Sequence, residues 1–480
     1  MEAAARSAST DERGSRLRAS TLKTRDLFSS CKLNTQPGRE RFVWLNNFEC
    51  EQFWASARTA RLFSLSSPAE NAIVNRMEEM CLWLAGEPDA VILRNAPAPD
   101  FLSYLAQIGI ALPEILTVEP ETVSPSISQA ILDGERFCRQ LNSLKNKDAD
   151  LYLLAYGNTN LEEKIAAAAG IPLLGPQAAV AAVVNSKIFS RRLSRRLGLR
   201  TVPGDECESL EELERALLRI KPHVAAGGKA VLKEAMGVSG KGLLVIENPE
   251  KLNQVLDFLK RRHKPELEYA FVVEQWIEKQ KDINYQIFVT PSGGVKFLAI
   301  KESFADGAVH AGHRCPPNLD EAQMDSYREA ALAVGRELHR SGYTGIAGID
   351  SVVDREGKIY PVLEINARFN MSTYQLSLER ALEPGTAFIV KNYSLLLKSL
   401  LRFQDLAGRL GTSLFGLNGS MRGVGVMCFA TVNCNMTPSV KKAKGRLYVF
   451  IAGKDFSEID FLDKKTQGCL EACGAAVTAR

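Results

Sequence analysis

The strongest chemical signal lies in GIAGIDSVVDREGKIYPVLEINARFN, residues 345–370. Glu364 and Asn366 are two residues apart, so on a strand their side chains point to the same face. A Glu-Gly turn joins their strand to the preceding one, which predicts a hairpin that brings Asp350 close to them. Two carboxylates and an amide oxygen are hard ligands that suit Mg²⁺, which completes its shell with water and phosphate. We therefore predict a metal site of Asp350, Glu364 and Asn366.

A lysine at the end of an apolar strand is the second signal. Lys233 stands in AVLKEAMGVSGKG, and burying its ammonium group is costly unless an anion meets it. The three glycines of residues 236–242 let the backbone approach a phosphate and point its N–H groups at it. The segment is not a Walker A loop, because it lacks the first glycine and the final Ser or Thr of that motif. We predict phosphate contacts from Lys233, Gly237, Ser239 and Gly240.

The segment VVEQWIE, residues 272–278, offers a surface for a purine ring. Here an apolar strand runs into residues that present backbone groups beside a flat apolar side chain. Asp282, a few residues on, can accept hydrogen bonds from ribose hydroxyls. A tryptophan at a strand edge is usually structural, so this signal gains weight only beside the others. The residues concerned are Glu274, Gln275, Trp276 and Ile277.

An arginine follows the metal candidates along the same strand. Arg368 is two residues beyond Asn366, so it can lie beside the ion. A guanidinium in that place neutralises charge that develops in phosphoryl transfer. We predict catalytic roles for Arg368 and Lys233.

The elements that must position these residues alternate between strand and helix from about residue 40. This alternation predicts a parallel sheet with helices on its faces. The expected strands are 42–48, 61–67, 90–96 and 114–120, and residues 150–176 repeat the plan of strand, helix and strand.

The pattern of residues changes near residue 185, and this change predicts a second architecture. A basic amphipathic helix over 186–199 leads into strands joined by turns, and Pro-Ser-Gly-Gly at 291–294 is typical of a hairpin turn. Another helix is expected over about 320–339. From roughly 395 a third region follows, with strands expected at 424–433 and 446–453 and a helix near 458–471.

Composition bounds the class of protein. The chain has 480 residues, of which 45% are hydrophobic and 24% charged, as in soluble proteins of two to four domains. The net charge of +4 gives no reason to expect a nucleic-acid or membrane partner. Ten cysteines without paired or zinc-like spacing indicate free thiols and a reducing cytosol. The uncharged stretch 165–184 contains two prolines and two glycines, which favours helix, short strand and helix over a membrane span.

The order of these features resembles the ATP-grasp superfamily. Lys187, Lys233 with its glycine loop, Glu274-Gln275-Trp276-Ile277, Asp350 and then Glu364-x-Asn366-x-Arg368 follow one another as in these enzymes. The last motif is similar to that of biotin carboxylase, carbamoyl phosphate synthetase and glycinamide ribonucleotide synthetase. The resemblance covers about 180–390 and implies an α/β and α+β protein. The first thirty residues, rich in Ser, Ala and Arg, are predicted to be a disordered tail (1–30). The units that follow are a Rossmann-like pre-ATP-grasp domain (31–180), an ATP-grasp domain (181–395) and a small C-terminal α+β region (396–480).

The resemblance also implies roles for single residues. Lys187 and Lys233 would contact the ATP phosphates, the hinge 274–277 would flank the adenine, and Asp282 would hold the ribose. Residues 308–317 fall where related enzymes have a loop between ATP and the acceptor, so His310, His313 and Arg314 are substrate candidates. D-alanine–D-alanine ligases have an arginine where this chain has Gly348, and Asp282 lies one residue later than usual. Both departures concern the subfamily and substrate.

The activity implied is an ATP-dependent carboxylate–amine ligase with ATP and Mg²⁺, for which Mn²⁺ would substitute. It would form an amide or peptide bond through an acyl phosphate, releasing ADP and phosphate, in amino-acid or specialised-metabolite biosynthesis. The partners would be a small carboxylate and an amine. Loading of an amino acid onto a carrier-protein thiol, a non-catalytic nucleotide-binding regulator and a small-molecule kinase stay open as alternatives. Homodimer formation also stays open.

Overall fold

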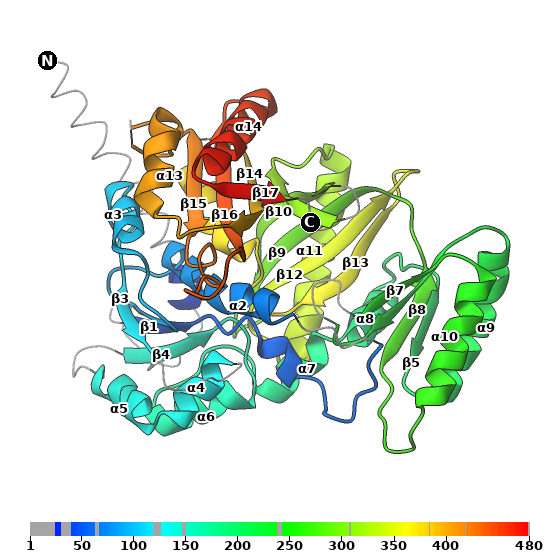
Figure 1. The fold of residues 1–480 in the computed structure, drawn as a ribbon. Helices are drawn as coiled ribbons and strands as arrows, with labels where there is room; N and C mark the ends of the chain where they lie inside the picture. Colours follow the sequence, from blue (N-terminus) through cyan, green and yellow to red (C-terminus); the bar gives the residue numbers. More distant parts are fainter. Residues whose placement is uncertain are drawn as a thin grey trace, which may run out of the picture.

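The computed structural model describes residues 25–29, 40–62, 67–118, 126–145, 150–237, 242–306, 309–383, 385–417 and 419–478. Three sheets organise these residues: a parallel sheet near the N-terminus, a small antiparallel sheet at one side, and a large sheet between them (Figure 1). Among the described helices, none has the length and apolar character needed to cross a bilayer.

The first sheet has four parallel strands in the order β3-β2-β1-β4. Its strands are β1 (Glu40–Leu45), β2 (Ala90–Leu93), β3 (Glu114–Thr117) and β4 (Asp150–Ala155). The helices of this part are η1 (Cys50–Phe53), α2 (Pro68–Arg76), η2 (Met77–Trp83), α3 (Pro99–Gln107), α4 (Ile127–Asp133), α5 (Glu135–Ser143), α6 (Asn160–Ala169) and α7 (Ala178–Val184). The predicted parallel sheet with helices is thus confirmed. The uncharged stretch divides as expected into the end of α6, a single bridge between Leu153 and Leu173, and α7.

Two expectations for the N-terminal part are wrong. Residues 61 and 62 are not in a strand, and 63–66 lie outside the described residues. The backbone N–H of Leu62 instead donates to Glu234 at 2.6 Å, which draws this segment away from the parallel sheet. Residues 25–29 of the tail predicted to be disordered are instead helical, and Arg25 donates to buried Asp89 at 2.9 Å. The rest of that tail lies outside the described residues.

The second sheet forms a small layered unit with two helices at the side of the molecule (Figure 1). Its antiparallel strands follow the order β5-β8-β6-β7. The strands are β5 (Gly204–Cys207), β6 (Ala230–Glu234), β7 (Leu243–Ile246) and β8 (Phe271–Gln275), and the helices are α9 (Leu210–Ala225) and α10 (Pro249–Arg262). Apolar residues of α9 and α10 form one core with the sheet, so the unit has its own hydrophobic centre.

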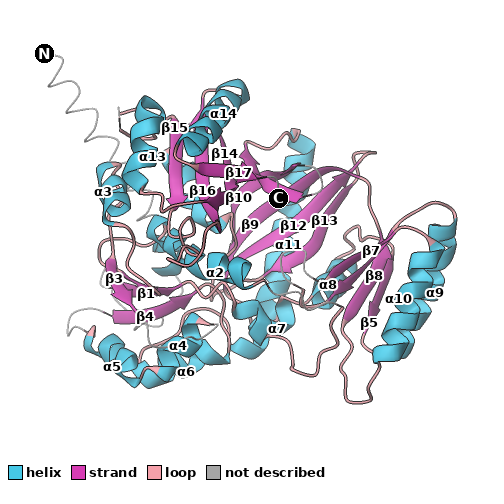
Figure 2. Cartoon of the chain, in the orientation of Figure 1, coloured by secondary structure: helices cyan, strands magenta, loops and turns pink. Residues whose placement is uncertain are grey.

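The third sheet has nine strands and contains most of the predicted site (Figure 2). Its main path is β13-β12-β9-β10-β11-β14-β16-β15, and β17 pairs with β14. The strands are β9 (Lys279–Val289), β10 (Val295–Asp306), β11 (Val309–Cys315), β12 (Gly345–Asp354), β13 (Ile359–Asn366), β14 (Ala387–Leu397), β15 (Gly423–Cys428), β16 (Ala443–Gly453) and β17 (Ala475–Thr478). The associated helices are α8 (Lys187–Arg196), α11 (Glu321–Arg340), η3 (Thr373–Gln375), α12 (Leu376–Ala381), α13 (Phe403–Leu410), η4 (Gly411–Ser413) and α14 (Phe456–Ala472).

Side chains along β9 alternate between the two faces of the sheet, and this alternation shows which face can hold a site. Ile283, Tyr285 and Ile287 pack in one apolar cluster with residues of α11, so α11 covers their face. The side chains of Asp282 and Asn284 therefore point to the opposite face. The same face continues through β12 and β13 by the cross-strand register.

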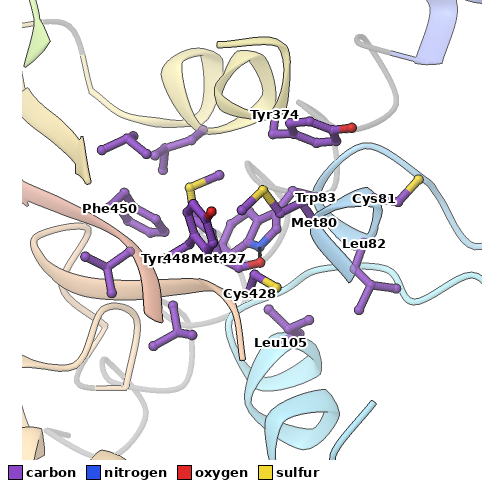
Figure 3. Packing of buried hydrophobic residues seen from close by; sticks show 14 of the residues in the cluster. Met80, Cys81, Leu82, Trp83, Leu105, Tyr374, Met427, Cys428, Tyr448 and Phe450 are labelled. Atoms are coloured by element: carbon purple, nitrogen blue, oxygen red, sulfur yellow. Dashed lines mark hydrogen bonds between the residues drawn. The ribbon is translucent and has the colours of Figure 1, made fainter. Parts of the chain in front are cut away.

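The C-terminal strands are joined to the N-terminal half through a shared core (Figure 3). The Trp83 ring contacts the ring of Phe450 edge to face at 5.4 Å, and its indole N–H donates to the carbonyl of Met427 at 3.1 Å. A ring of this size that is fully buried with its polar atom satisfied fixes two elements against each other. The region after residue 395 thus extends the nine-stranded sheet and also packs on η2.

Buried Glu78 gives this core a dependence on pH. Burial raises the pKa of Glu78 from its usual 4.5 to about 8. Because its folded-state pKa lies above its unfolded value, the associated stability is present below pH 4.5 and is lost as the pH rises towards 8. We expect the melting temperature to fall between pH 5 and pH 8.5, and Glu78→Gln to reduce that fall. Exposed Glu329→Gln is the control, and equal slopes in wild type and Glu78→Gln would contradict the assignment.

Candidate active site

A row of polar residues crosses the face of the large sheet that lies opposite α11. Asp350 on β12 pairs directly with Glu364 on β13 and with Asn284 on β9, and Asn284 pairs with Lys301 on β10. Residues that pair directly across strands have side chains on the same face. Asn366 is two residues beyond Glu364 and shares that face. The structure therefore brings Asp350, Glu364 and Asn366 together.

Asp350 is buried in this row and has two amide partners. Its carboxylate accepts hydrogen bonds from the Asn284 amide at 2.7 Å and the Asn366 amide at 2.9 Å. Burial raises the pKa of Asp350 to about 6, and the neighbouring negative charge of Glu364 adds to this rise, while the two amides and Arg368 act against it. A buried carboxylate next to a second one is stabilised in its charged form by a cation between them.

The donor set fits a divalent cation. Among the described residues, no three His, Cys, Asp or Glu side chains are placed to hold a metal, so a protein-only carboxylate cage is not found there. Asp350 and Glu364 supplemented by an amide oxygen suit Mg²⁺, which keeps positions for water and phosphate. The Asn366 amide oxygen accepts from Arg368 at 2.8 Å, so this amide must turn to present its oxygen to the ion.

Lys187 begins helix α8 and reaches the metal candidates from the side. Its ammonium group donates to Glu364 Oε1 and to the carbonyl of Gly237, each at 2.8 Å. Lys187 therefore joins α8, the strand β13 and the start of the predicted phosphate loop. Ser239 and Gly240 of that loop lie outside the described residues.

Lys233 lies in a buried charge network on the small sheet. Its ammonium group pairs with Glu274 of the adjacent strand β8, and the second oxygen of Glu274 pairs with Arg191 of α8. Arg191 also donates to Glu206 of β5 at 2.7 Å. The side chain of Glu274 thus organises two cations, whereas the sequence suggested that its backbone mattered. The network fixes the small sheet against α8.

The predicted hinge connects the two antiparallel sheets. The N–H of Gln275 donates to the carbonyl of Pro203 at 2.9 Å, and that of Trp276 to the carbonyl of Lys229 at 2.8 Å. Ile277 packs in a small cluster with residues of the large sheet. Asp282 begins the polar face of β9 and pairs with Lys279.

The three substrate candidates of β11 fall in different environments. His313 is 9% exposed and lies opposite Ser303, which is itself opposite Asp282, so His313 shares the face of the metal candidates. Arg314 alternates to the other face, where it pairs with Glu302. The structure therefore does not bring Arg314 to the metal candidates. The backbone of His310 pairs with Ala305, and its side chain is outside the described part.

Arg368 lies where the large sheet meets the carboxyl ends of the parallel strands. Its Nη2 donates to Asn366, as above, and forms an ion pair with Glu51 of η1. Its guanidinium carbon lies 5.3 Å from the centre of the Tyr156 ring. Burial lowers the pKa of Arg368, but Glu51 leads several neighbours that outweigh this effect and raise it overall. Arg368 is thus held charged beside Asn366.

Several site residues were not identified from the sequence, among them Arg191, Asn284, Lys301 and Glu51. Arg191 looked like one of several cations on an amphipathic helix. Asn284 carried a usable signal, because it follows Asp282 by two residues and therefore lies on the same face of the strand. Glu51 lies more than 300 positions from Arg368, and no local pattern relates the two.

Comparison with known families matches two stretches of the chain. Residues 77–171 match the family model of the pre ATP-grasp domain, and residues 186–376 match the ATP-binding domain of the carbamoyl-phosphate synthase L chain. The chain is 30% identical over 342 residues to [butirosin acyl-carrier protein]–L-glutamate ligase of Niallia circulans, which covers 71% of this chain and 74% of that protein. The chain belongs to the ATP-grasp superfamily.

Other ATP-grasp proteins share its fold. Biotin carboxylase 2 of Bacillus subtilis is 25% identical over 255 residues, or 51% of this ATP-grasp ligase and 54% of that enzyme. The crystal structure of a biotin carboxylase–beta-gamma-ATP complex from Campylobacter jejuni superposes with a TM-score of 0.53 at 13% identity, covering 90% of this chain and 95% of the other. The predicted fold class is confirmed, and the chain is an ATP-dependent ligase. ATP with magnesium is the cofactor set of this superfamily, and a related solved structure contains MgADP.

Proposed function

We propose that this chain activates a small carboxylate, most simply that of an amino acid, as an acyl phosphate and transfers the acyl group to an amine. The observation that supports the proposal is the row of Asp350 and Glu364 with Asn366 beside it, approached by Lys187 from α8. In this arrangement a divalent cation and the phosphates of ATP would meet at one place. Lys233 and its glycine loop would hold the phosphates from the small sheet.

The reaction has two balanced steps. A carboxylate oxygen attacks the γ-phosphorus of ATP, the bond from that phosphorus to the bridging oxygen breaks, and ADP leaves. The acceptor amine then attacks the acyl carbon, phosphate leaves with the bonding electron pair, and the nitrogen loses a proton. Magnesium, or manganese in its place, would supply charge neutralisation on the phosphate oxygens. Positioning and electrostatics account for most of the catalysis in such transfers.

Each residue of the chain has a proposed part in these steps. Lys187 and Lys233 would neutralise the phosphates, and Arg368 would face the acyl phosphate. The hinge 274–277 would hold the adenine by its backbone, with Asp282 on the ribose. His313, which shares the face of the metal candidates, is the better placed of the two described substrate candidates. The proposed units remain 31–180 for the pre-ATP-grasp part and 181–395 for the ATP-grasp part.

A carrier-protein thiol is the second candidate acceptor. The relative from Niallia circulans is named as a ligase of glutamate to an acyl-carrier protein, and it aligns with about three quarters of its length. In that version the thiolate sulfur attacks the acyl carbon, and the product is a thioester in place of an amide. A homodimer is also proposed, since one related solved structure is a biotin carboxylase domain dimer.

Phosphate release from pairs of substrates tests the proposal. Purified protein with Mg²⁺ and ATP is offered glutamate and other amino acids, each with an amine or with a phosphopantetheinylated acyl-carrier protein. We expect ADP and phosphate to form only when both carboxylate and acceptor are present. A product cleaved by neutral hydroxylamine would be a thioester, and a resistant one an amide.

Two results would contradict the proposed ligase. Pyrophosphate and AMP in place of phosphate and ADP would mean that the acyl group is activated as an adenylate. ATP consumption that yields a stable phosphorylated substrate without any acceptor would identify a kinase.

A further inference from the structure

Glu51 links the parallel sheet to the proposed phosphoryl-transfer centre. It lies in η1, shortly after β1, and its side chain is 10% exposed. Ligands of parallel α/β sheets bind beyond the carboxyl ends of the strands. At this edge the N–H of Phe369 donates to the carbonyl of Tyr156 at 3.0 Å, so the end of β4 contacts the backbone beside Arg368. The pair of Glu51 and Arg368 therefore stands where the two halves of the protein meet.

The guanidinium group of Arg368 is held on two sides. Nη1 donates to the carbonyl of Phe369 at 2.8 Å, and Nη2 is shared between Asn366 and Glu51. Nε is buried and has no partner in the described part of the chain. Glu51 is the acidic group that forms an ion pair with this arginine. Its removal would leave this buried cation without its ion-pair partner, which is unfavourable unless another carboxylate takes that place.

Asn366 links Arg368 to the metal carboxylates, because its amide oxygen accepts from Arg368 at 2.8 Å and its amide nitrogen donates to Asp350 at 2.9 Å. Glu364 is among the groups that raise the pKa of Arg368, and Arg368 in turn lowers that of Asp350. An arginine freed from Glu51 would therefore be drawn towards Glu364 and Asp350, because charges attract strongly across a buried site. A guanidinium bound there would compete with a divalent cation for the same oxygens.

We propose that Glu51 is a positioning residue that holds Arg368 away from the metal carboxylates and so keeps Asp350 and Glu364 available to Mg²⁺. The inference rests on the proposed function for the identity of the metal site. It assigns to the pre-ATP-grasp part a role in metal binding at the other sheet. Glu51 itself would touch neither metal nor nucleotide.

Calorimetric titration of ADP, with and without Mg²⁺, separates this role from a purely structural one. Glu51→Gln keeps the size of the side chain and removes its charge. We expect it to weaken the apparent affinity for Mg²⁺ about tenfold, the lower end of the loss typical when a metal ligand loses its supporting contact. The affinity for ADP without Mg²⁺ should change by less than about twofold, because no phosphate contact is altered.

A double variant identifies Arg368 as the intermediary. In Glu51→Gln with Arg368→Met no guanidinium can move onto the carboxylates, so the Mg²⁺ affinity should return to within about threefold of wild type. Glu70→Gln is the matched control, since it breaks another ion pair between distant segments, with Arg446 at 2.9 Å. It should lower the melting temperature without changing the dependence on Mg²⁺.

The outcomes distinguish this inference from the proposed function. Unchanged Mg²⁺ affinity in Glu51→Gln, or a loss that Arg368→Met does not reverse, would overturn the role of Glu51 while the ligase could stand. If all these titrations give the expected changes but no acceptor-dependent phosphate release is found, the role of Glu51 would be supported and the ligase overturned. A wild-type protein that binds ADP without any effect of Mg²⁺ would overturn both.

Discussion

Replacing Glu364 with alanine is expected to lower the rate of acceptor-dependent phosphate release at saturating ATP by about 10³-fold, since a metal ion contributes several kcal/mol to such a transfer. Glu364 lies directly opposite Asp350, and the change would also leave the ammonium group of Lys187 without its carboxylate partner. Both effects would impair the neutralisation of negative charge on the ATP phosphates. The measurement is steady-state phosphate release over a range of Mg²⁺ concentrations.

The same hairpin supplies a matched control. Glu356 is an exposed glutamate in the turn between β12 and β13, so Glu356→Ala removes the same atoms from the same hairpin. It should leave the rate within about twofold of wild type, as for most surface substitutions. A Glu364→Ala protein that is folded by circular dichroism and still turns over normally would remove the basis for the metal site.

Lys233→Met is expected to weaken ATP binding by about 10- to 100-fold, the loss that corresponds to one charge-assisted hydrogen bond to a phosphate. Methionine keeps the apolar stem of the side chain within β6. Glu274 would retain its ion pair with Arg191, so the small sheet should stay folded. Equilibrium titration with an ATP analogue gives the affinity, and thermal unfolding checks the fold.

Lys229→Met is the control for this change, because Lys229 precedes the same strand and its side chain is 45% exposed. It removes a positive charge from the same unit without altering the buried network. Equal losses in both variants would mean that long-range charge, and not a phosphate contact, explains the effect of Lys233.

The metal candidates could be predicted because their geometry is local. Glu364 and Asn366 share a face by the period of a strand, and one short turn brings Asp350 opposite them. The same argument could not predict Asn284 and Lys301, which lie on a third and a fourth strand. Their position beside Asp350 depends on the register between strands, and bulges change that register. One such irregularity lies between Phe297 and Ala299 of β10.

Ion-pair partners that are distant in sequence could not be predicted for a different reason. The partners of Arg191 and Glu51 are set by how α8 and η1 are placed against other sheets, and side-chain type alone allows many choices. Fold prediction had the same limit. The strands of the C-terminal region were expected as a separate unit, but β14 was missed, and it carries the pairing from β11 into β16.

The contact between Lys187 and Glu364 has a thermodynamic consequence for the order in which ligands arrive. The ammonium and the carboxylate neutralise each other across the gap between α8 and β13. A triphosphate that takes the ammonium releases the carboxylate, and a divalent cation that takes the carboxylate releases the ammonium. Each ligand thus removes a cost that the other would meet, so their affinities rise together by one common factor. The magnesium complex of the nucleotide is then favoured over either component as the species that enters.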